Sequence, residues 1–347
     1  MSSELSKKTN EGKDLIINGS TLSFKLRELP LTINSFPRPY VVNVIENVDK
    51  FHAFISDADL LIIDENINRY YPINESKISN VFKIIAIEEK KTLETVESLI
   101  EVMILNEISK GSKVVALGGG IIQDITACAC AMFRRGQPFV YMPTTTLGQL
   151  DSCVGAKCAI NTLKAKNIIG LFSAPKEVVI PTFMIKSMQV DEHRAGLSEM
   201  LRLCLTASED SVNQYIKYFD FISIPSKMNI DIYKSALRLS LSIKKTVVDY
   251  DEYETDVRRS MNYGHTFGHA IEKLSNYSLP HGLAVLLGMH ISNLFSNSIG
   301  IMNETTLAYV SKAFAMTLKG VNNVFEEISN VDPEMIANKS LLKAQIA

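Results

Sequence analysis

Three of the chain's six histidines fall close together in the last third of the sequence. Residues 262–269 read Asn-Tyr-Gly-His-Thr-Phe-Gly-His, and an isolated His281 follows. Neutral imidazole is the commonest side-chain ligand of transition metals, and His265 and His269 would share one face of a helix. The cluster therefore predicts a metal-assisted active site. A zinc protease is not indicated, because Thr266 occupies the position of the glutamate in the HExxH motif.

A carboxylate inside an apolar helical segment could complete such a site. Glu199 lies in the stretch 196–202, which reads Gly-Leu-Ser-Glu-Met-Leu-Arg. Two alternatives are open for it: an ion pair with Arg202, three positions later, or a bond to a metal. With His265 and His281 it would form a two-histidine, one-carboxylate set, which is a common catalytic zinc shell with an open position.

Glycine-rich and polar loops follow several apolar runs in the first half of the chain. Gly118–Gly120 would join a strand to a helix, whose N-terminus attracts phosphate; a turn without a ligand is the alternative. Asp64, at an earlier strand end, could bind ribose hydroxyls. The loops 144–146 and 151–157, together with Lys166 and Asn167, favour an anion site about as much as a solvated surface.

The order of the apolar patterns predicts an α/β fold. Buried strands are expected at 40–45, 60–63, 81–87, 113–117 and 139–142, with helices at 91–107 and from the glycines to residue 132. This alternation predicts a parallel sheet. Helices are expected at 184–218, 230–250, 262–275, 282–298 and 304–318. We expect a flexible tail over residues 1–18, an α/β domain over 19–180 and an all-α domain over 181–347.

Composition excludes some classes of function. A formal net charge of −2 argues against non-specific nucleic-acid binding, which requires many neutralised phosphates. The most apolar stretch, 114–133, is interrupted by glycines, Gln123 and Asp124, so no membrane-spanning helix is expected. Five cysteines without a CxxC pair indicate a reduced, cytoplasmic setting. The charged runs at 251–254 and 258–259 are, by their pattern alone, expected to be solvated helix charge.

Together these motifs resemble the 3-dehydroquinate synthase family, the NAD-dependent sugar phosphate cyclases. The resemblance extends from about Leu60 to Met302. Its motifs are GGGxxxD at 118–124, RG at 135–136, PTT at 143–145, DSxVGxK at 151–157, KNxxG at 166–170, GLxE at 196–199 and NxGHTFGHAIE at 262–272. The resemblance implies a Rossmann-like NAD-binding domain followed by a helical domain that binds metal and substrate, in a homodimer.

Carried over position by position, the resemblance implies roles for individual residues. The metal ligands are Glu199, His265 and His281. The NAD-binding positions are Asp64, Asn66, Glu88, Lys91, Gly118, Gly119, Gly120, Asp124, Thr144, Thr145, Lys157 and Lys166. The substrate positions are Asp151, Lys157, Asn167, Arg202, Lys244, Arg258, Asn262 and His269, and Arg135 reaches the neighbouring subunit's site.

The family reaction starts from a seven-carbon sugar acid phosphate. It combines a transient oxidation by NAD, elimination of phosphate, return of the hydride and an intramolecular aldol closure, with one divalent zinc or cobalt ion. The partner that this implies is a small-molecule sugar phosphate, with neither nucleic acid nor membrane. Arg258 and Asn262 favour the acid substrate, because relatives that cyclise uncharged sugar phosphates tend to vary there.

The chain departs from the family pattern at several places. Arg202 stands where the family has a lysine that contacts the substrate, and Leu283 replaces a glutamate that is a plausible partner of a metal ligand. The chain stops at Ala347, before a Lys-Lys pair for which Lys339 and Lys343 are possible substitutes. These departures keep open a repurposed cyclase and a non-catalytic family member. A metal-dependent polyol dehydrogenase is the third alternative.

Overall fold

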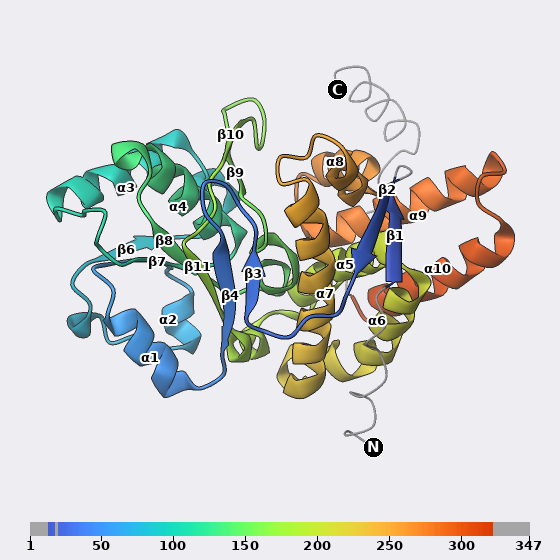
Figure 1. The fold of residues 1–347 in the computed structure, drawn as a ribbon, viewed down its shortest axis with the longest axis horizontal. Coiled ribbons are helices and arrows are strands. Elements are labelled where there is room, and N and C mark those ends of the chain that lie inside the picture. The colour runs from blue at the N-terminus through green and yellow to red at the C-terminus, as the bar shows by residue number, and fades with distance from the viewer. Residues whose placement is uncertain (1–12, 18–19, 322–347) are drawn as a thin grey trace. The chain divides into compact units, whose positions relative to one another are not determined.

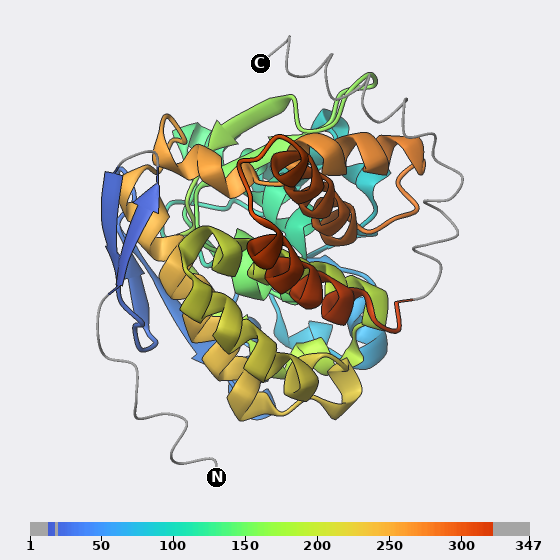
Figure 2. The same ribbon diagram turned by 90° about the vertical axis from the view of Figure 1, so that its right-hand side faces the viewer.

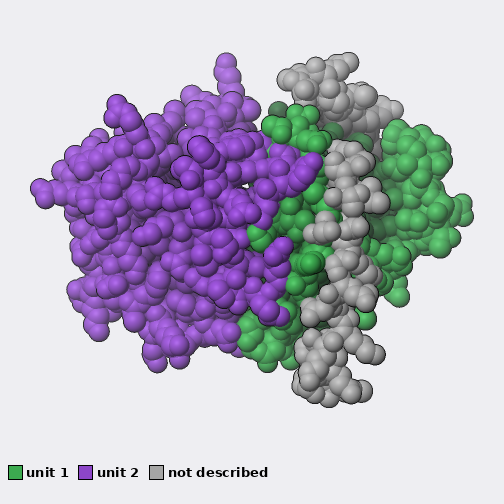
Figure 3. All heavy atoms as spheres, in the orientation of Figure 1, with its two compact units in different colours: residues 1–26, 188–247, 254–347 green, residues 27–187, 248–253 purple. Residues whose placement is uncertain are grey.

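The computed structural model describes residues 13–17 and 20–321 of the chain. The chain divides into two compact units, and unit 2 comprises residues 27–187 and 248–253. Unit 1 comprises the remainder (Figure 3). Residues 1–12 of the predicted tail lie outside the described residues, and its later part contains strand β1 (Lys13–Ile17), which pairs antiparallel with β2 (Ser20–Phe24).

Unit 2 is built on a mostly parallel sheet, which confirms the predicted α/β class (Figure 1). Among its described residues, seven strands form this sheet, in the order β3 (Leu31–Ile33), β4 (Tyr40–Ile45), β11 (Glu177–Pro181), β8 (Phe139–Pro143), β7 (Val114–Gly118), β5 (Leu60–Asp64) and β6 (Val81–Ile84). All neighbours are parallel except β3 and β4. The central strands are continuous apolar runs, as expected for a sheet covered on both faces.

Helices cover both faces of the sheet (Figure 1). Helices α1 (Val48–Ser56) and α2 (Ile67–Tyr70) lie on one face, where Phe51 and Ile55 pack against Leu61 and Ile63 of β5. Helices α3 (Leu93–Leu105) and α4 (Gly120–Met132) lie on the other face. Parallel strands joined by crossover helices place their carboxyl ends along one edge of the sheet, where the polar loops follow.

Most predicted strands and helices of unit 2 agree with the structure, with four differences. Helices α1 and α2 were not predicted. The strand predicted over 81–87 ends at Ile84, because the chain then forms a short 3₁₀ turn over Glu88–Lys90. The short strands β3 and β11 were not predicted. Nor was the antiparallel hairpin of β9 (Lys157–Ile160) and β10 (Ile169–Phe172), because each strand has only four residues and β10 has no buried residue.

Unit 1 contains the predicted helices (Figure 2). They are α5 (Val190–Ala207), α6 (Glu209–Ile222), α7 (Ile230–Tyr250), α8 (His265–Leu274), α9 (His281–Ser298) and α10 (Glu304–Leu318). The prediction of one helix over 184–218 was wrong. Ser208 has an extended backbone, and its side chain accepts a hydrogen bond from the amide of Ser211, so it caps a new helix. Among the described residues, no helix is both long and apolar enough to cross a membrane.

Glycines allow α8 and α9 to approach each other closely. A Cβ atom on Gly288 would collide with the backbone of Gly264, and one on Gly268 would lie 2.9 Å from the Cα of Val285. Gly264 also has a φ of +81°, a conformation that suits glycine at the start of α8. This close packing brings the first turn of α9 beside the histidines of α8.

Burial of His193 in α5 predicts a pH-dependent stability. The side chain is fully buried, its Nε2 lies 2.6 Å from the carbonyl oxygen of Ile222, and burial lowers its pKa from 6.5 to about 4. Between these values the unfolded chain binds the additional proton. Stability should therefore fall as pH is lowered from 6.5 towards 4, by on the order of 1 kcal/mol per pH unit.

Urea unfolding at several pH values measures this dependence. The variant His193→Gln should show a shallower loss of stability at acid pH than the wild type, because it carries no titrating group. The variant His52→Gln, which changes a partly exposed histidine, should retain the wild-type dependence. An unchanged slope in His193→Gln would contradict the assignment to this side chain.

Candidate active site

Glu199 lies on α5 in the interior of unit 1. Its exposed fraction is 1% and that of Arg202 is 2%. The Nε of Arg202 donates a hydrogen bond of 2.5 Å to Oε2 of Glu199, and an Nη1 hydrogen donates to the carbonyl oxygen of Met261. Of the two alternatives for Glu199, the ion pair is therefore formed. It engages only one of the two carboxylate oxygens, so it does not exclude a metal at the other.

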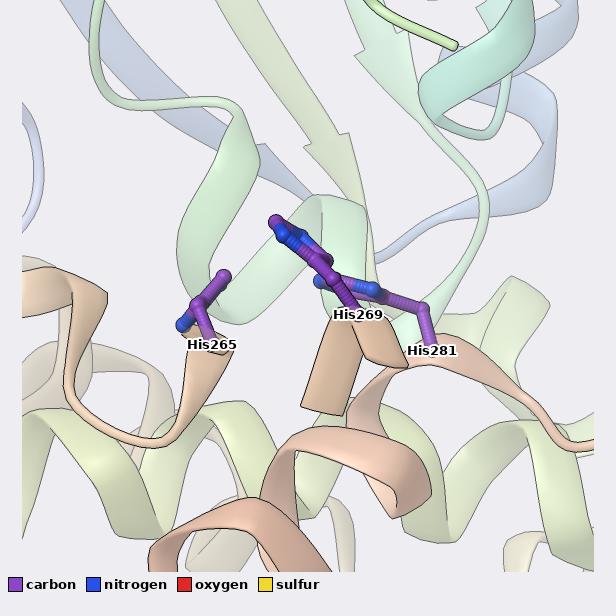
Figure 4. Close-up of side chains that lie close together, drawn as sticks. All are labelled: His265, His269 and His281. Carbon is purple, nitrogen blue, oxygen red and sulfur yellow. The ribbon is translucent and has the colours of Figure 1, made fainter. Parts of the chain in front are cut away.

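The three clustered histidines converge on one place in unit 1. His265 lies in the first turn of α8, His269 one turn later and His281 at the start of α9 (Figure 4). Each offers a ring nitrogen, and these atoms all lie within 4.8 Å of one another. Oε1 of Glu199 lies 3.5 Å from Nε2 of His281. The structure thus brings together all three predicted metal ligands, with His269 beside them.

Two of these imidazoles have opposite pKa shifts. Burial lowers the pKa of His265 to about 4, although the charge of Glu199 opposes the shift. Burial also acts to lower the pKa of His281, but the hydrogen bond to Glu272 and the charges of Glu199 and Glu272 outweigh it and raise the pKa. His265 is therefore neutral at physiological pH and able to donate its lone pair to a metal.

The donor set is chemically suited to a divalent transition metal. Imidazole nitrogens together with one carboxylate are typical ligands of zinc, and the same donors suit cobalt. Two ligands of a tetrahedral zinc, each about 2.1 Å from the ion, are about 3.4 Å apart. The 3.5 Å between Oε1 of Glu199 and Nε2 of His281 is close to that separation. The residues therefore fit the implied metal.

Several predicted NAD positions of unit 2 lie at the ends of three neighbouring parallel strands. Asp64 ends β5, Gly118 ends β7, and Thr144 and Thr145 follow β8. A Cβ on Gly119 would lie 2.9 Å from Cγ2 of Thr145, whereas one on Gly120 would meet no atom of the described chain within 4 Å. The backbone at the start of α4 is therefore open, and a phosphate could approach its N–H groups.

A polar network joins several of these positions. Nζ of Lys91 lies 2.7 Å from Oδ2 of Asp124 and 2.6 Å from Oδ1 of Asn167. Burial raises the pKa of Asp124, and the charge of Lys91 opposes the shift. Asn161, which the sequence did not single out, donates to Oε1 of Glu88 at 2.8 Å and accepts from the amide of Asn167 at 2.9 Å. Asn161 therefore links a proposed NAD residue to a proposed substrate residue.

The remaining predicted residues of unit 2 have varied environments. Asn66 donates from its side chain to Oδ1 of Asp64 at 3.0 Å, and Nζ of Lys166 lies 3.8 Å from Oε1 of Glu88. Three further positions are placed as follows: Asp151 is buried in a short turn over 148–152, Lys157 is exposed at the start of β9, and Arg135 is exposed with a φ of 60°.

The expectation of solvated helix charge at 251–254 and 258–259 was wrong: residues 251–254 follow the end of α7, and Asp251 and Arg258 are buried. Glu254 makes specific contacts. Its Oε1 accepts a hydrogen bond of 2.7 Å from Nδ2 of Asn262, and its Oε2 lies 4.0 Å from Nε of the buried Arg258. Lys244, on α7, is also buried. Glu254 thus contacts two proposed substrate residues, and its spacing of four from Arg258 was the available signal.

Glu272, the last residue of the motif at 262–272, makes a contact that the sequence did not indicate. Its Oε2 lies 3.1 Å from Nδ1 of His281. Leu283, in contrast, is fully buried in an apolar cluster with Ile271 and Leu279. The helical spacing of three between His269 and Glu272 could have indicated a shared face. Lys339 and Lys343, the possible C-terminal phosphate residues, lie outside the described residues.

Family models match most of the chain. The model of the 3-dehydroquinate synthase N-terminal region matches residues 81–195, and that of the 3-dehydroquinate synthase C-terminal region matches residues 196–334. A 3-dehydroquinate synthase of Sulfurovum sp. (strain NBC37-1) is 34% identical over 247 residues, which are 69% of this chain and 69% of the relative.

Solved structures of cyclases share the fold. A 2-deoxy-scyllo-inosose synthase, complexed with carbaglucose-6-phosphate, NAD⁺ and Co²⁺, has a TM-score of 0.78 at 25% identity, covering 90% of this chain and 88% of that one. The 2-epi-5-epi-valiolone synthase of Streptomyces hygroscopicus subsp. jinggangensis 5008, with NAD⁺ and Zn²⁺ bound, has a TM-score of 0.73 at 23% identity, covering 91% and 88%. Both matches extend over nearly the whole chain.

Fold, sequence motifs and the clustered donor atoms agree with these matches. The two family models together extend across residues 81–334, which include the glycine turn, Glu199 and all three clustered histidines. The chain belongs to the 3-dehydroquinate synthase family of sugar phosphate cyclases, which are carbon–oxygen lyases.

Proposed function

We propose that the protein is a metal- and NAD-dependent cyclase that eliminates phosphate from a seven-carbon sugar acid phosphate, as a 3-dehydroquinate synthase does. The observation that carries the proposal is a cluster of three imidazoles whose ring nitrogens lie within 4.8 Å of one another, with one of them, on His281, 3.5 Å from the buried carboxylate of Glu199. The matching synthases that contain NAD⁺ with Co²⁺ or Zn²⁺ support both cofactors for this chain.

The chain's residues would hold these groups in their respective units. Glu199, His265 and His281 would bind the metal, and the backbone of Gly119 and Gly120, which is open at Gly120, would bind the pyrophosphate of NAD. When bound, the metal supplies Lewis acidity to a substrate hydroxyl and NAD supplies a reversible hydride acceptor.

The cationic residues of unit 1 support an acidic substrate. Arg258 is 4% exposed, and the carboxylate of Glu254 restrains both it and Asn262. A guanidinium can bind a carboxylate through two parallel hydrogen bonds, so Arg258 would suit the acid group of such a substrate. Lys244 and His269 are further candidates for anionic groups of the substrate.

A cyclase of a different sugar phosphate is the second candidate, and Arg202 motivates it. The family lysine at this position contacts the substrate, whereas Arg202 donates to Glu199 and to the carbonyl oxygen of Met261. An arginine engaged in this way offers the substrate a different surface from a lysine ammonium. This candidate shares the metal, NAD and phosphate release with the first.

A cytoplasmic homodimer is the proposed setting. All five cysteines are free and buried, which suits a reducing compartment. Arg135 is exposed in a tight turn with Arg134 and Gly136, in which all three residues have positive φ values. Such a turn could present Arg135 to the site of a partner subunit.

Phosphate release tests the proposed reaction. The metal-loaded protein with NAD should release inorganic phosphate from the seven-carbon acid phosphate without net NADH, because the hydride is returned. Removal of the metal by a chelator should lower the rate by at least about 100-fold, and zinc or cobalt should restore it.

A substrate panel separates the alternatives. Release from sedoheptulose or glucose phosphate, but not from the acid, would favour the second candidate. Stoichiometric NADH with a polyol would instead indicate a dehydrogenase. A protein that binds NAD tightly but neither binds metal nor turns over any of these compounds would be a non-catalytic family member.

The substitution Gly120→Ala tests the proposed pyrophosphate position. The new methyl group would fill the open space at the start of α4 without touching the described chain, so NAD affinity should fall about tenfold or more. Thermal stability should be equal or slightly higher, because alanine is a better helix residue than glycine.

Gly111→Ala is the matched control for this experiment. A Cβ there would lie 4.0 Å from its nearest neighbour, Oγ of Ser109, so the substitution is equally tolerated but lies in the loop before β7. NAD affinity, measured by calorimetry, should be unchanged in this variant. Wild-type NAD affinity in Gly120→Ala would exclude this approach of the pyrophosphate.

A further inference from the structure

The carboxylate of Glu272 contacts a proposed metal ligand on the side away from the other ligands. Its Oε2 lies 3.1 Å from Nδ1 of His281, while Nε2 of the same ring faces Oε1 of Glu199 at 3.5 Å. An imidazole whose Nδ1–H donates to a carboxylate carries its lone pair on Nε2. Glu272 therefore favours the tautomer in which the inward nitrogen can bind a metal.

The second proposed ligand is held in a comparable way. Arg202 donates to Oε2 of Glu199 at 2.5 Å, and the other oxygen of this carboxylate faces His281. Oε2 of Glu199 is thus held by Arg202 and Nδ1 of His281 by Glu272, while Oε1 and Nε2 of these two residues face each other. This arrangement orients the pair before any ion binds.

The outer carboxylate comes from the neighbouring helix and not from position 283. Position 283, where the family pattern has a glutamate, is a leucine with an exposed fraction of 0%, packed against Ile271 and Leu279. Glu272 belongs to the neighbouring helix α8, and its side chain is 13% exposed. It reaches His281 across the closely packed pair α8 and α9.

We propose that Glu272 is a positioning residue of the metal centre, which fixes the tautomer and ring orientation of His281. The proposal rests on the proposed function in assuming that His281 binds a metal. Outer carboxylates of this kind raise the basicity of the histidine ligand, and their loss typically lowers metal affinity 10- to 100-fold, as order-of-magnitude values.

Metal affinity of two variants tests the proposal. Competition with a chromophoric chelator measures Zn²⁺ and Co²⁺ affinity, and the visible spectrum of bound Co²⁺ reports the ligand arrangement. Glu272→Ala should lower the affinity by roughly 10- to 100-fold. Glu272→Gln should lower it only a few-fold, because its amide oxygen still accepts from Nδ1–H. Glu304→Ala, which removes an exposed acid of α10, is the control and should leave it unchanged.

Further measurements separate positioning from a structural role. The melting temperature of the metal-free protein and its NAD affinity should be the same in Glu272→Ala as in the wild type. Wild-type metal affinity in Glu272→Ala would overturn the proposal even if phosphate release remained intact. If that variant does not fold, Glu272→Gln decides: a few-fold loss with the Co²⁺ spectrum retained supports the proposal, and wild-type affinity overturns it.

A failure of the proposed function gives a different result. If the wild-type protein binds neither Zn²⁺ nor Co²⁺, both the proposed metal-dependent reaction and the proposed role of Glu272 are contradicted. If the wild-type protein binds metal and releases phosphate, and Glu272→Ala has the same metal affinity, only the positioning role of Glu272 is contradicted.

Discussion

The burial of the Glu199 carboxylate is the constraint on which the site of unit 1 depends. A charge that is 1% exposed inside an apolar helix would cost several kcal/mol without compensation. Arg202 supplies that compensation and also donates to the carbonyl oxygen of Met261, so its planar group is fixed at two points. A lysine ammonium has no such fork. Arginine at this position therefore holds the carboxylate in one orientation and lowers the negative charge presented to a cation.

Glycines serve both proposed cofactor sites, but by different physical means. In unit 1, Gly264, Gly268 and Gly288 remove side chains between α8 and α9, and this brings His281 beside the histidines of α8. In unit 2, the absence of a side chain at Gly120 leaves the start of α4 open to a ligand. The first set determines how helices pack, and the second determines what a helix end can bind.

Hydrophobic pattern and helix caps explain why most elements could be predicted and a few could not. The parallel strands are apolar runs covered on both faces, so β4, β5, β7 and β8 were predicted within about a residue. The break at Ser208 was missed because apolar spacing continues across it, whereas the cap depends on one hydroxyl. The histidine cluster was visible because its members lie close in sequence. The contacts of Glu254 and Glu272 were not predicted: Glu254 reaches Asn262 across the turn before α8, and Glu272 reaches His281 on the next helix.

The leucine at position 283 does not have the effect on the metal site that the sequence alone suggests. Read alone, the leucine removes a possible carboxylate partner of His281. In the structure this position is fully buried among apolar side chains, where a carboxylate would need a compensating partner of its own. Nδ1 of His281 is directed instead towards Glu272 on the adjacent helix. The glycines of α8 and α9 set the distance between these helices. Helix α8 can therefore supply the carboxylate that position 283 of α9 lacks.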